Sequence, residues 1–181
     1  MTINERKQVL RKKVRSLKLE YSLVQKKELS KKICHKIENN SVFKNAKTIM
    51  AYWSMDDEVF THDFIQKWAK EKRIILPVVN ENNLELKEFN GVDELVFGDK
   101  FGIPEPSGQL FENPETIDLI IVPGIAFDKN GNRMGRGKAY YDKLLRTTKA
   151  YKLGICFSFQ VFDIVPFDEL DVKMNDVLFN T

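Results

Sequence analysis

The chain is poor in the residues that build metal centres and covalent cross-links. Among its 181 residues are two cysteines, Cys34 and Cys156, and two histidines, His35 and His62. Two widely separated cysteines make no disulfide framework, so each is interpreted as a small buried residue. No stretch offers the three or four clustered Cys, His and carboxylate ligands of a zinc site, which argues against a structural transition metal.

Long apolar runs are missing as well. No segment approaches the ~20 consecutive apolar residues of a membrane-spanning helix, and the first ten residues, MTINERKQVL, lack the apolar core of a signal peptide. Apolar residues nevertheless make up 43% of the chain and charged residues 30%, as in ordinary globular proteins. We therefore expect one globular domain spanning residues 1–181, cytoplasmic, monomeric and without a membrane partner.

Positive charge is concentrated near the N-terminus. Residues 1–36 hold twelve Lys and Arg but three Glu, whereas the remainder holds 17 basic and 23 acidic residues, for a net charge of +3. This asymmetry favours an anionic partner, although two Lys-rich helices with solvated faces would produce the same pattern. Nucleic acid is not expected as that partner, because the chain has neither an RNP motif nor a zinc knuckle.

The periodicity predicts helices that alternate with strands. Thr2 with Glu5 and Ser22 with Gln25 have capping-box spacing, which predicts two helices, the second ending at Asn39 and Asn40. Further helices are predicted over residues 62–72 and 138–146. Apolar runs predict strands over residues 48–53, 74–79, 84–89, 117–122, 152–157 and 177–179. This order indicates an α/β fold, a single three-layer α/β/α sandwich with a mostly parallel sheet.

Two segments carry local expectations. Pro77 argues that the strand over residues 74–79 lies at a sheet edge or contains a bulge, because proline cannot donate to a ladder. Residues 91–114 are rich in Gly, Pro and acidic residues and are expected to be irregular or lightly ordered.

The segment that carries chemistry is VPGIAFDKNGNRMGRGKAYYDKLL, residues 122–145. A predicted buried strand enters a loop with four glycines, and a helix leaves it. Glycines let backbone N–H groups approach phosphate, and three cations within six residues suit a polyphosphate. The cations are Arg133, Arg136 and Lys138. The segment is neither a P-loop nor a dinucleotide fingerprint, because Asn132 and Tyr140 stand where those motifs need glycine.

Residues 123–142, PGIAFDKNGNRMGRGKAYYD, resemble the signature of the 5-formyltetrahydrofolate cyclo-ligase family. Weaker matches stand in the expected order: KQVLR with Lys7 and Arg11, SMDDEV with Glu58, and FGIPEP over residues 101–106. The resemblance covers essentially the whole chain. It implies an α/β/α fold and the conversion of 5-formyltetrahydrofolate and ATP, with Mg²⁺, to 5,10-methenyltetrahydrofolate, ADP and phosphate. The small-molecule partners implied are therefore ATP and 5-formyltetrahydrofolate.

The resemblance also implies site residues. Those that would bind the nucleotide are Lys7, Arg11, Arg133, Gly135, Arg136, Gly137, Lys138, Ala139, Tyr140 and Tyr141. Those that would bind the folate are Trp53, Glu58, Arg136 and Tyr140, with Phe101, Glu105, Pro106 and Phe127 as weaker candidates. Arg136 and Lys138 are the catalytic candidates, and Asp142 with Asn175 the magnesium candidates. Asp56 and Asp57, next to Glu58, are interpreted as surface charges.

Two positions depart from the family pattern. Ala139 stands where the family usually has glycine, which matters if the backbone there has positive φ. Asn175 stands where an aspartate is expected, and a neutral amide is a weaker Mg²⁺ ligand, so Asp171 or Asp176 is an alternative. Two other function classes stay open from the residues alone: another ATP-dependent enzyme of similar fold, and a nucleic-acid-binding module that uses the basic N-terminal helices.

Overall fold

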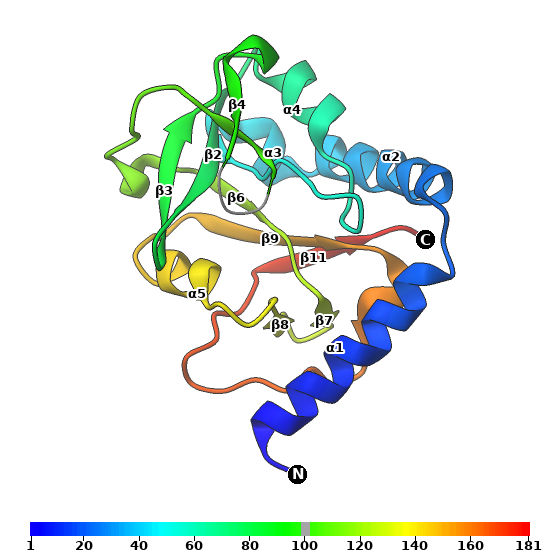
Figure 1. The fold of residues 1–181 in the computed structure, drawn as a ribbon. Coiled ribbons are helices and arrows are strands. Elements are labelled where there is room, and N and C mark those ends of the chain that lie inside the picture. Colours follow the sequence, from blue (N-terminus) through cyan, green and yellow to red (C-terminus); the bar gives the residue numbers. More distant parts are fainter. Residues whose placement is uncertain (99–101) are drawn as a thin grey trace.

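A central six-stranded sheet organises the computed structural model, which describes residues 1–98 and 102–181 (Figure 1). Its strand order is β11-β9-β6-β1-β2-β3. These strands are β1 (Thr48–Met50), β2 (Arg73–Asn80), β3 (Asn83–Glu88), β6 (Leu119–Val122), β9 (Tyr151–Cys156) and β11 (Asp176–Phe179). All neighbours pair in parallel except β2 and β3, which form an antiparallel hairpin. The predicted α/β class with a mostly parallel sheet is confirmed.

Helices cover the sheet and the ends of its strands. They are α1 (Ile3–Leu19), α2 (Leu23–Asn39), α3 (Ser41–Asn45), α4 (His62–Trp68) and α5 (Tyr140–Leu145), with 3₁₀ turns at Val92–Glu94, Pro114–Thr116 and Ser158–Gln160. Both predicted capping boxes are present, since Thr2 and Ser22 each exchange hydrogen bonds with the residue three positions later. No helix in the described ranges is long and apolar enough to cross a membrane.

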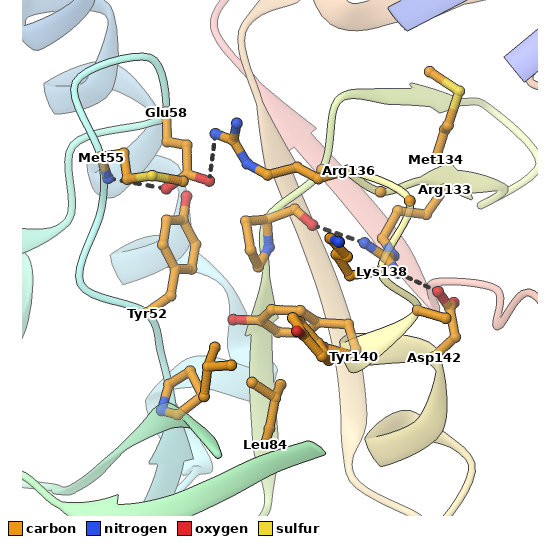
Figure 2. A pocket seen from close by; sticks show the side chains of 18 of the residues that line it. Tyr52, Met55, Glu58, Leu84, Arg133, Met134, Arg136, Lys138, Tyr140 and Asp142 are labelled. Atoms are coloured by element: carbon orange, nitrogen blue, oxygen red, sulfur yellow. Dashed lines mark hydrogen bonds and ion pairs between the residues drawn. The ribbon is translucent and has the colours of Figure 1, made fainter. Parts of the chain in front are cut away.

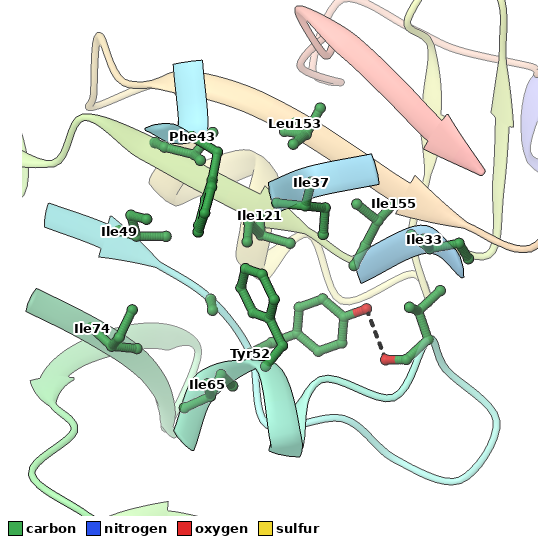
Figure 3. Packing of buried hydrophobic residues seen from close by; sticks show 14 of the residues in the cluster. Ile33, Ile37, Phe43, Ile49, Tyr52, Ile65, Ile74, Ile121, Leu153 and Ile155 are labelled. Carbon is green, nitrogen blue, oxygen red and sulfur yellow. Dashed lines mark hydrogen bonds between the residues drawn. The ribbon is translucent and has the colours of Figure 1, made fainter. Parts of the chain in front are cut away.

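Alternation along the strands builds a separate core on each face of the sheet. Ile49, Ile74 and Ile121 point to one face, where Ile33 and Ile37 of α2 and residues of α3 and α4 cover them (Figure 3). Met50, Ile75 and Ile120 point to the other face. There they pack with Leu145 of α5 and with Phe127. Successive side chains of a strand point to opposite faces of the sheet, and both faces are buried here. These strands therefore appear in the sequence as almost continuous apolar runs.

A small sheet extends the second face beneath α1. Its order is β10-β7-β8, from β10 (Val161–Phe162), β7 (Ala126–Asp128) and β8 (Arg133–Met134). Val14 of α1 packs against Ala126 and Met134 and has no exposed surface. The Gly-rich segment is therefore a folded β-hairpin that continues into a loop and then α5. Its contact with Val14 brings α1 alongside that loop.

The structure corrects some local expectations. Strand β2 is not at the edge. Pro77 lies beyond the end of β1, in the half of β2 that pairs with β3, and the register between β2 and β3 contains no bulge. The described part of 91–114 is lightly ordered, one of the two expectations for it, because the short strands β4 (Leu95–Phe97) and β5 (Pro104–Pro106) form an antiparallel pair. Phe101 lies outside the described residues.

Candidate active site

A cavity of about 560 Å³ opens at the carboxyl ends of β1 and β6. These strands are neighbours in the middle of the sheet, and the chain crosses from β1 toward β2 but from β6 toward β9. Such a switch in direction leaves a crevice where ligands bind in open α/β sheets. Tyr52, Trp53 and Glu58 follow β1 into this crevice, and Pro123 and Gly124 follow β6.

The cavity gathers the predicted site residues from segments far apart in the sequence. Among its lining residues are Lys7, Arg11, Trp53, Glu58, Arg133, Gly135, Arg136, Gly137, Lys138, Ala139, Tyr140, Tyr141 and Asp142. The weaker candidates Glu105 and Pro106 also line it. Phe127 instead belongs to the core, where it is fully buried.

Asn175, the second magnesium candidate, is also not brought to this cavity. It is exposed beside β9, where its Oδ1 accepts a hydrogen bond from the backbone N–H of Lys152 at 2.8 Å. The side chain thus secures the start of β11 against β9. Asp171, the alternative carboxylate, does line the cavity, as does Asp168.

Lys7 enters the cavity from α1 between two aspartates. Its Nζ lies 2.8 Å from Asp168 Oδ2 and 2.6 Å from Asp171 Oδ2. Burial alone would lower the pKa of Lys7, but the hydrogen bonds to the two carboxylates outweigh burial and raise it above the ordinary lysine value. Lys7 therefore stays charged, and its charge is balanced within the protein.

Arg11 follows Lys7 by one helical turn and contacts the Gly-rich loop. Its Nε donates to the carbonyl of Gly135 at 3.0 Å, and a side chain on Gly137 would meet its guanidinium at 3.5 Å. Burial lowers the pKa of Arg11, which remains far above neutrality because an arginine is always protonated in proteins. Within the described residues no salt bridge neutralises Arg11 or Lys138, so both keep a free charge at the cavity.

Arg133 and Asp142 form a buried pair on the cavity floor. Arg133 Nη2 lies 2.8 Å from Asp142 Oδ2, and their side chains are 3% and 9% exposed. Arg133 Nη1 also donates to the carbonyl of Pro123, while the buried Nε finds no hydrogen-bond acceptor among the described residues. Asp142 Oδ1 accepts from the N–H of Val172. Arg133 therefore orients Asp142 (Figure 2). The hydrogen bond from Val172 also brings Asp171, the residue before Val172, close to Asp142.

Arg136 and Glu58 face each other across the opening of the cavity (Figure 2). Arg136 Nη2 donates to Glu58 Oε1 at 3.1 Å, and Glu58 Oε2 accepts from the N–H of Met55 at 3.0 Å. Burial alone would lower the pKa of Arg136, but Glu58 and Asp57 outweigh it and raise that pKa. The loop after β1 and the Gly-rich loop are thereby joined by a charged contact.

Trp53 is held as a cavity wall by His62, the first residue of α4. The two rings stack with centroids 4.0 Å apart and an interplanar angle of 12°. His62 Nε2 donates to the Ser54 carbonyl at 2.9 Å, and burial outweighs that bond and lowers the pKa of His62. The imidazole is thus neutral at pH 7, with the Nε2 proton committed to the backbone.

The loop between β8 and α5 needs left-handed backbone at two positions. Gly137 has φ +103°, and Ala139, which precedes α5, has φ +56°. The helix consequently begins at Tyr140 rather than at residue 138. Ala139 thus occupies an αL conformation that costs about 1–2 kcal/mol for a residue with a side chain, which is the physical reason why glycine suits this position.

Two features of the site were missed from the sequence. Asp57 was interpreted as a surface charge, yet it pairs with Lys18 at 2.9 Å and with Arg136 at 2.7 Å. Lys18 lies on the helical stripe of Lys7, Arg11 and Val14, and that spacing could have identified it. Asp168 carries no such signal, because only the fold brings it to α1, whereas Asp171 was expected as an alternative magnesium ligand and not as a partner of Lys7. Cys156 is buried, as predicted, whereas Cys34 is only partly buried, although burial still raises the pKa of Cys34 to about 12.

The parallel sheet and the charged crevice at its switch point are those of an α/β enzyme. Residues 3–180 match the 5-formyltetrahydrofolate cyclo-ligase family. The 5-formyltetrahydrofolate cyclo-ligase of Mus musculus is 32% identical over 198 residues, which cover 99% of this chain and 96% of the mouse protein. The Haemophilus influenzae cyclo-ligase is 28% identical, with 96% of this chain and 97% of that protein covered.

Solved structures agree with this match. The Aquifex aeolicus 5,10-methenyltetrahydrofolate synthetase superimposes with a TM-score of 0.86 at 37% identity, covering 96% of this chain and 89% of that one. The Mycoplasma pneumoniae 5,10-methenyltetrahydrofolate synthetase gives a TM-score of 0.75 at 27% identity, covering 95% and 97%. The chain belongs to the 5-formyltetrahydrofolate cyclo-ligase family, whose members are ligases.

Proposed function

We propose that this protein converts 5-formyltetrahydrofolate to 5,10-methenyltetrahydrofolate, using ATP and Mg²⁺ and releasing ADP and phosphate. The observation that carries the proposal is a single cavity in which Lys7, Arg11 and the Gly-rich loop stand opposite the loop that bears Trp53 and Glu58. One side is cationic, as phosphates require, and the other offers an aromatic wall and a carboxylate, as a pterin requires.

The chemistry needs no covalent nucleophile from the protein. The formyl oxygen takes the γ-phosphoryl group of ATP, so that an O–P bond forms and the bond to ADP breaks. The anilino nitrogen of the folate then attacks the formyl carbon of this iminium phosphate and loses its proton, while the C–O bond breaks and phosphate leaves. The protein must hold both substrates in line and stabilise charge on the transferred group.

The charge balance of the cavity divides the cations into two groups. Lys7 and Arg133 are paired with carboxylates that also line the cavity, whereas Arg11 and Lys138 have no salt bridge among the described residues. The positive charges of Arg11 and Lys138 are thus not balanced by these salt bridges, and we assign the two residues to the phosphates of ATP. Arg136 has further guanidinium donors besides the nitrogen that contacts Glu58, and it is the second catalytic candidate with Lys138.

Glu58 has capacity left to bind a pterin. Its two oxygens each accept one hydrogen bond, from Arg136 and from the Met55 N–H. A carboxylate can accept about four, so two positions remain for the amino and ring N–H donors of a pyrimidinone edge. Tyr140, on the opposite wall, lies where its ring can pack against the folate.

The donor set fits a magnesium ion held by few protein ligands. Asp142 and Asp171 both line the cavity, and the described residues contain no cluster of three or more His, Cys, Asp or Glu that would form an all-protein site. Mg²⁺ characteristically binds through one or two carboxylates together with water and phosphate oxygens. Asp142 and Asp171, rather than Asn175, would hold it, and when bound it would neutralise charge on the ATP phosphates.

The test is an absorbance assay for methenyltetrahydrofolate with purified protein, 5-formyltetrahydrofolate, Mg²⁺ and ATP, repeated with each component omitted. Product that requires all of them is the expected result. Lys138→Ala should lower kcat by about 10²–10³-fold, as for loss of one transition-state donor, while Lys12→Ala on the exposed face of α1 should not. Folded protein that makes no product, or a phosphorylated product that persists, would instead point to a different ATP-dependent enzyme.

A further inference from the structure

Lys18 is a buried lysine that the reaction proposed above does not use. It lies in the last turn of α1 and is 5% exposed, on the same stripe as Lys7, Arg11 and Val14. Its Nζ contacts Asp57 Oδ2 at 2.9 Å, the single ion pair that it makes within residues 1–98 and 102–181. Burial outweighs this pairing and lowers the pKa of Lys18. A lysine is almost never buried so deeply without a structural or functional reason.

Asp57 connects Lys18 to the catalytic candidate Arg136. While Oδ2 of Asp57 accepts from Lys18, Oδ1 accepts from Arg136 Nη2 at 2.7 Å. The same Nη2 lies 3.1 Å from Glu58 Oε1. Charges of alternating sign therefore run from Lys18 through Asp57 and Arg136 to Glu58, and they join α1, the loop after β1 and the Gly-rich loop.

Arg136 donates to Asp57 through one nitrogen, Nη2, and to one oxygen, Oδ1. Arginine and carboxylate groups usually prefer two parallel hydrogen bonds. The ammonium group of Lys18 contacts the oxygen of Asp57 that a second bond would need, and its positive charge repels a guanidinium nitrogen there. In consequence a single nitrogen of Arg136 is committed to both carboxylates. Its Nε and Nη1 make no hydrogen bond within the described part of the chain, and they remain available to an anionic ligand in the cavity.

We propose that Lys18 is a positioning residue, whose ammonium group at Asp57 Oδ2 repels a second guanidinium nitrogen and so keeps Asp57 from taking Arg136 in a two-bond pair away from Glu58 and the cavity. This inference rests on the proposed function, in which Arg136 serves the phosphoryl transfer. When the ammonium group of Lys18 is removed, both oxygens of Asp57 can accept hydrogen bonds from the Arg136 guanidinium. That group then turns away from the substrate and toward Asp57.

Lys18→Met tests the inference, because methionine replaces most of the buried stem and removes the charge. We expect kcat/KM for 5-formyltetrahydrofolate to fall on the order of ten- to a hundredfold, as for misplacement of a substrate-contacting group. Lys18→Arg should retain most activity, and Lys12→Met, on the exposed face of the same helix, is the matched control. Should Lys18→Met not fold, Lys18→Gln keeps a neutral donor for Asp57 and should show an intermediate loss.

A double variant separates a positioning role of Lys18 from a purely structural one. Asp57→Asn added to Lys18→Met removes the carboxylate that captures Arg136, and it should restore kcat/KM to within a few-fold of the wild-type value. A purely structural role of the Lys18–Asp57 pair predicts no restoration, because the pair is equally absent in both variants. Lys18→Met kinetics equal to those of Lys12→Met, or a double variant no better than Lys18→Met, would overturn the inference.

The NMR signal of the Arg136 Nε–H group, assigned with Arg136→Lys, supplies a readout that does not depend on turnover. A two-bond pair with Asp57 should shift this signal and slow its exchange with water in Lys18→Met, and Asp57→Asn should reverse both effects. If the wild-type protein made no product, the proposed function would fail. An unchanged Arg136 signal in Lys18→Met would reject the role of Lys18 in either case.

Discussion

The two N-terminal helices, α1 and α2, have almost the same local sequence character but opposite roles. Each begins with a capping box, spans 17 residues and is rich in lysine. The buried stripe of α2 is formed by Ile33, Ile37 and Ser30, which cover the sheet, and several of its lysines are exposed. The buried residues of α1 are Val14 and two lysines, Lys7 and Lys18, whose ammonium groups meet carboxylates.

The difference teaches that the number of positive charges on a helix does not reveal its function. A lysine that points to solvent on α2 can contribute to solubility, whereas a lysine that the fold buries on α1 must find a carboxylate or a ligand. Which face of the helix meets the rest of the protein decides between the two. In this molecule α1 packs over the Gly-rich loop, and α2 packs over the apolar sheet.

The largest expected effect tests α2 as a structural helix. Ile37→Ala removes a side chain with no exposed surface from the core cluster and should lower the free energy of unfolding by about 2–5 kcal/mol. Urea denaturation measures this loss. In the folded fraction at low temperature, kcat/KM should stay near the wild-type value, and a selective loss of activity would contradict the comparison.

The next effect tests α1 as a functional helix. Arg11→Ala should raise KM for ATP or lower kcat by about 10²-fold in total, because it removes a cation that makes no salt bridge with any described residue. Lys31→Ala on α2 is the control, since Lys31 is exposed and its salt bridge is with Glu28 of the same helix. Steady-state kinetics compare the two. Equal activity of both variants would show that the stripe of α1 is not part of the site.

A smaller effect concerns the loop that α1 faces. Ala139→Gly should relieve the cost of positive φ, and because glycine is also more flexible in the unfolded chain, the net gain in stability should be about 1 kcal/mol or less. The midpoint of urea unfolding should therefore rise slightly. A destabilised variant would mean that the Ala139 methyl group makes contacts that outweigh the backbone strain.

The smallest effect lies at the end of α2. Burial would raise the pKa of Glu38, but hydrogen bonds from Lys67 and Trp68 outweigh it and lower that pKa. A carboxyl group with a lowered folded-state pKa adds stability above its unfolded value, near 4.3, and loses it as the pH falls through the folded-state value.

Because Lys67 is exposed, this contribution should be about 0.5 kcal/mol. Glu38→Gln should be slightly less stable than wild type at pH 7, and the difference should shrink toward pH 3. Thermal unfolding at the two pH values measures it. A difference that grew as the pH fell would contradict the assignment of this ion pair.

Much of the architecture was predictable because local signals and tertiary packing agree. The capping boxes at Thr2 and Ser22, and the apolar run that became β6, needed no long-range information. Element ends were less predictable. The strand expected to reach residue 53 ends at Met50, because the chain leaves the sheet there to form the cavity, and α5 starts late because Gly137 and Ala139 are left-handed.

The amino-acid sequence by itself determined the class of fold, the Gly-rich loop and the family resemblance, since these depend on periodicity and on one contiguous motif. Only the tertiary structure decided that Asp57 is held between Lys18 and Arg136, that Asp171 and not Asn175 lies beside the loop, and which lysines are buried. The physical reason is that charge pairing is short-ranged within a folded protein, so it depends on distances that sequence separation does not encode.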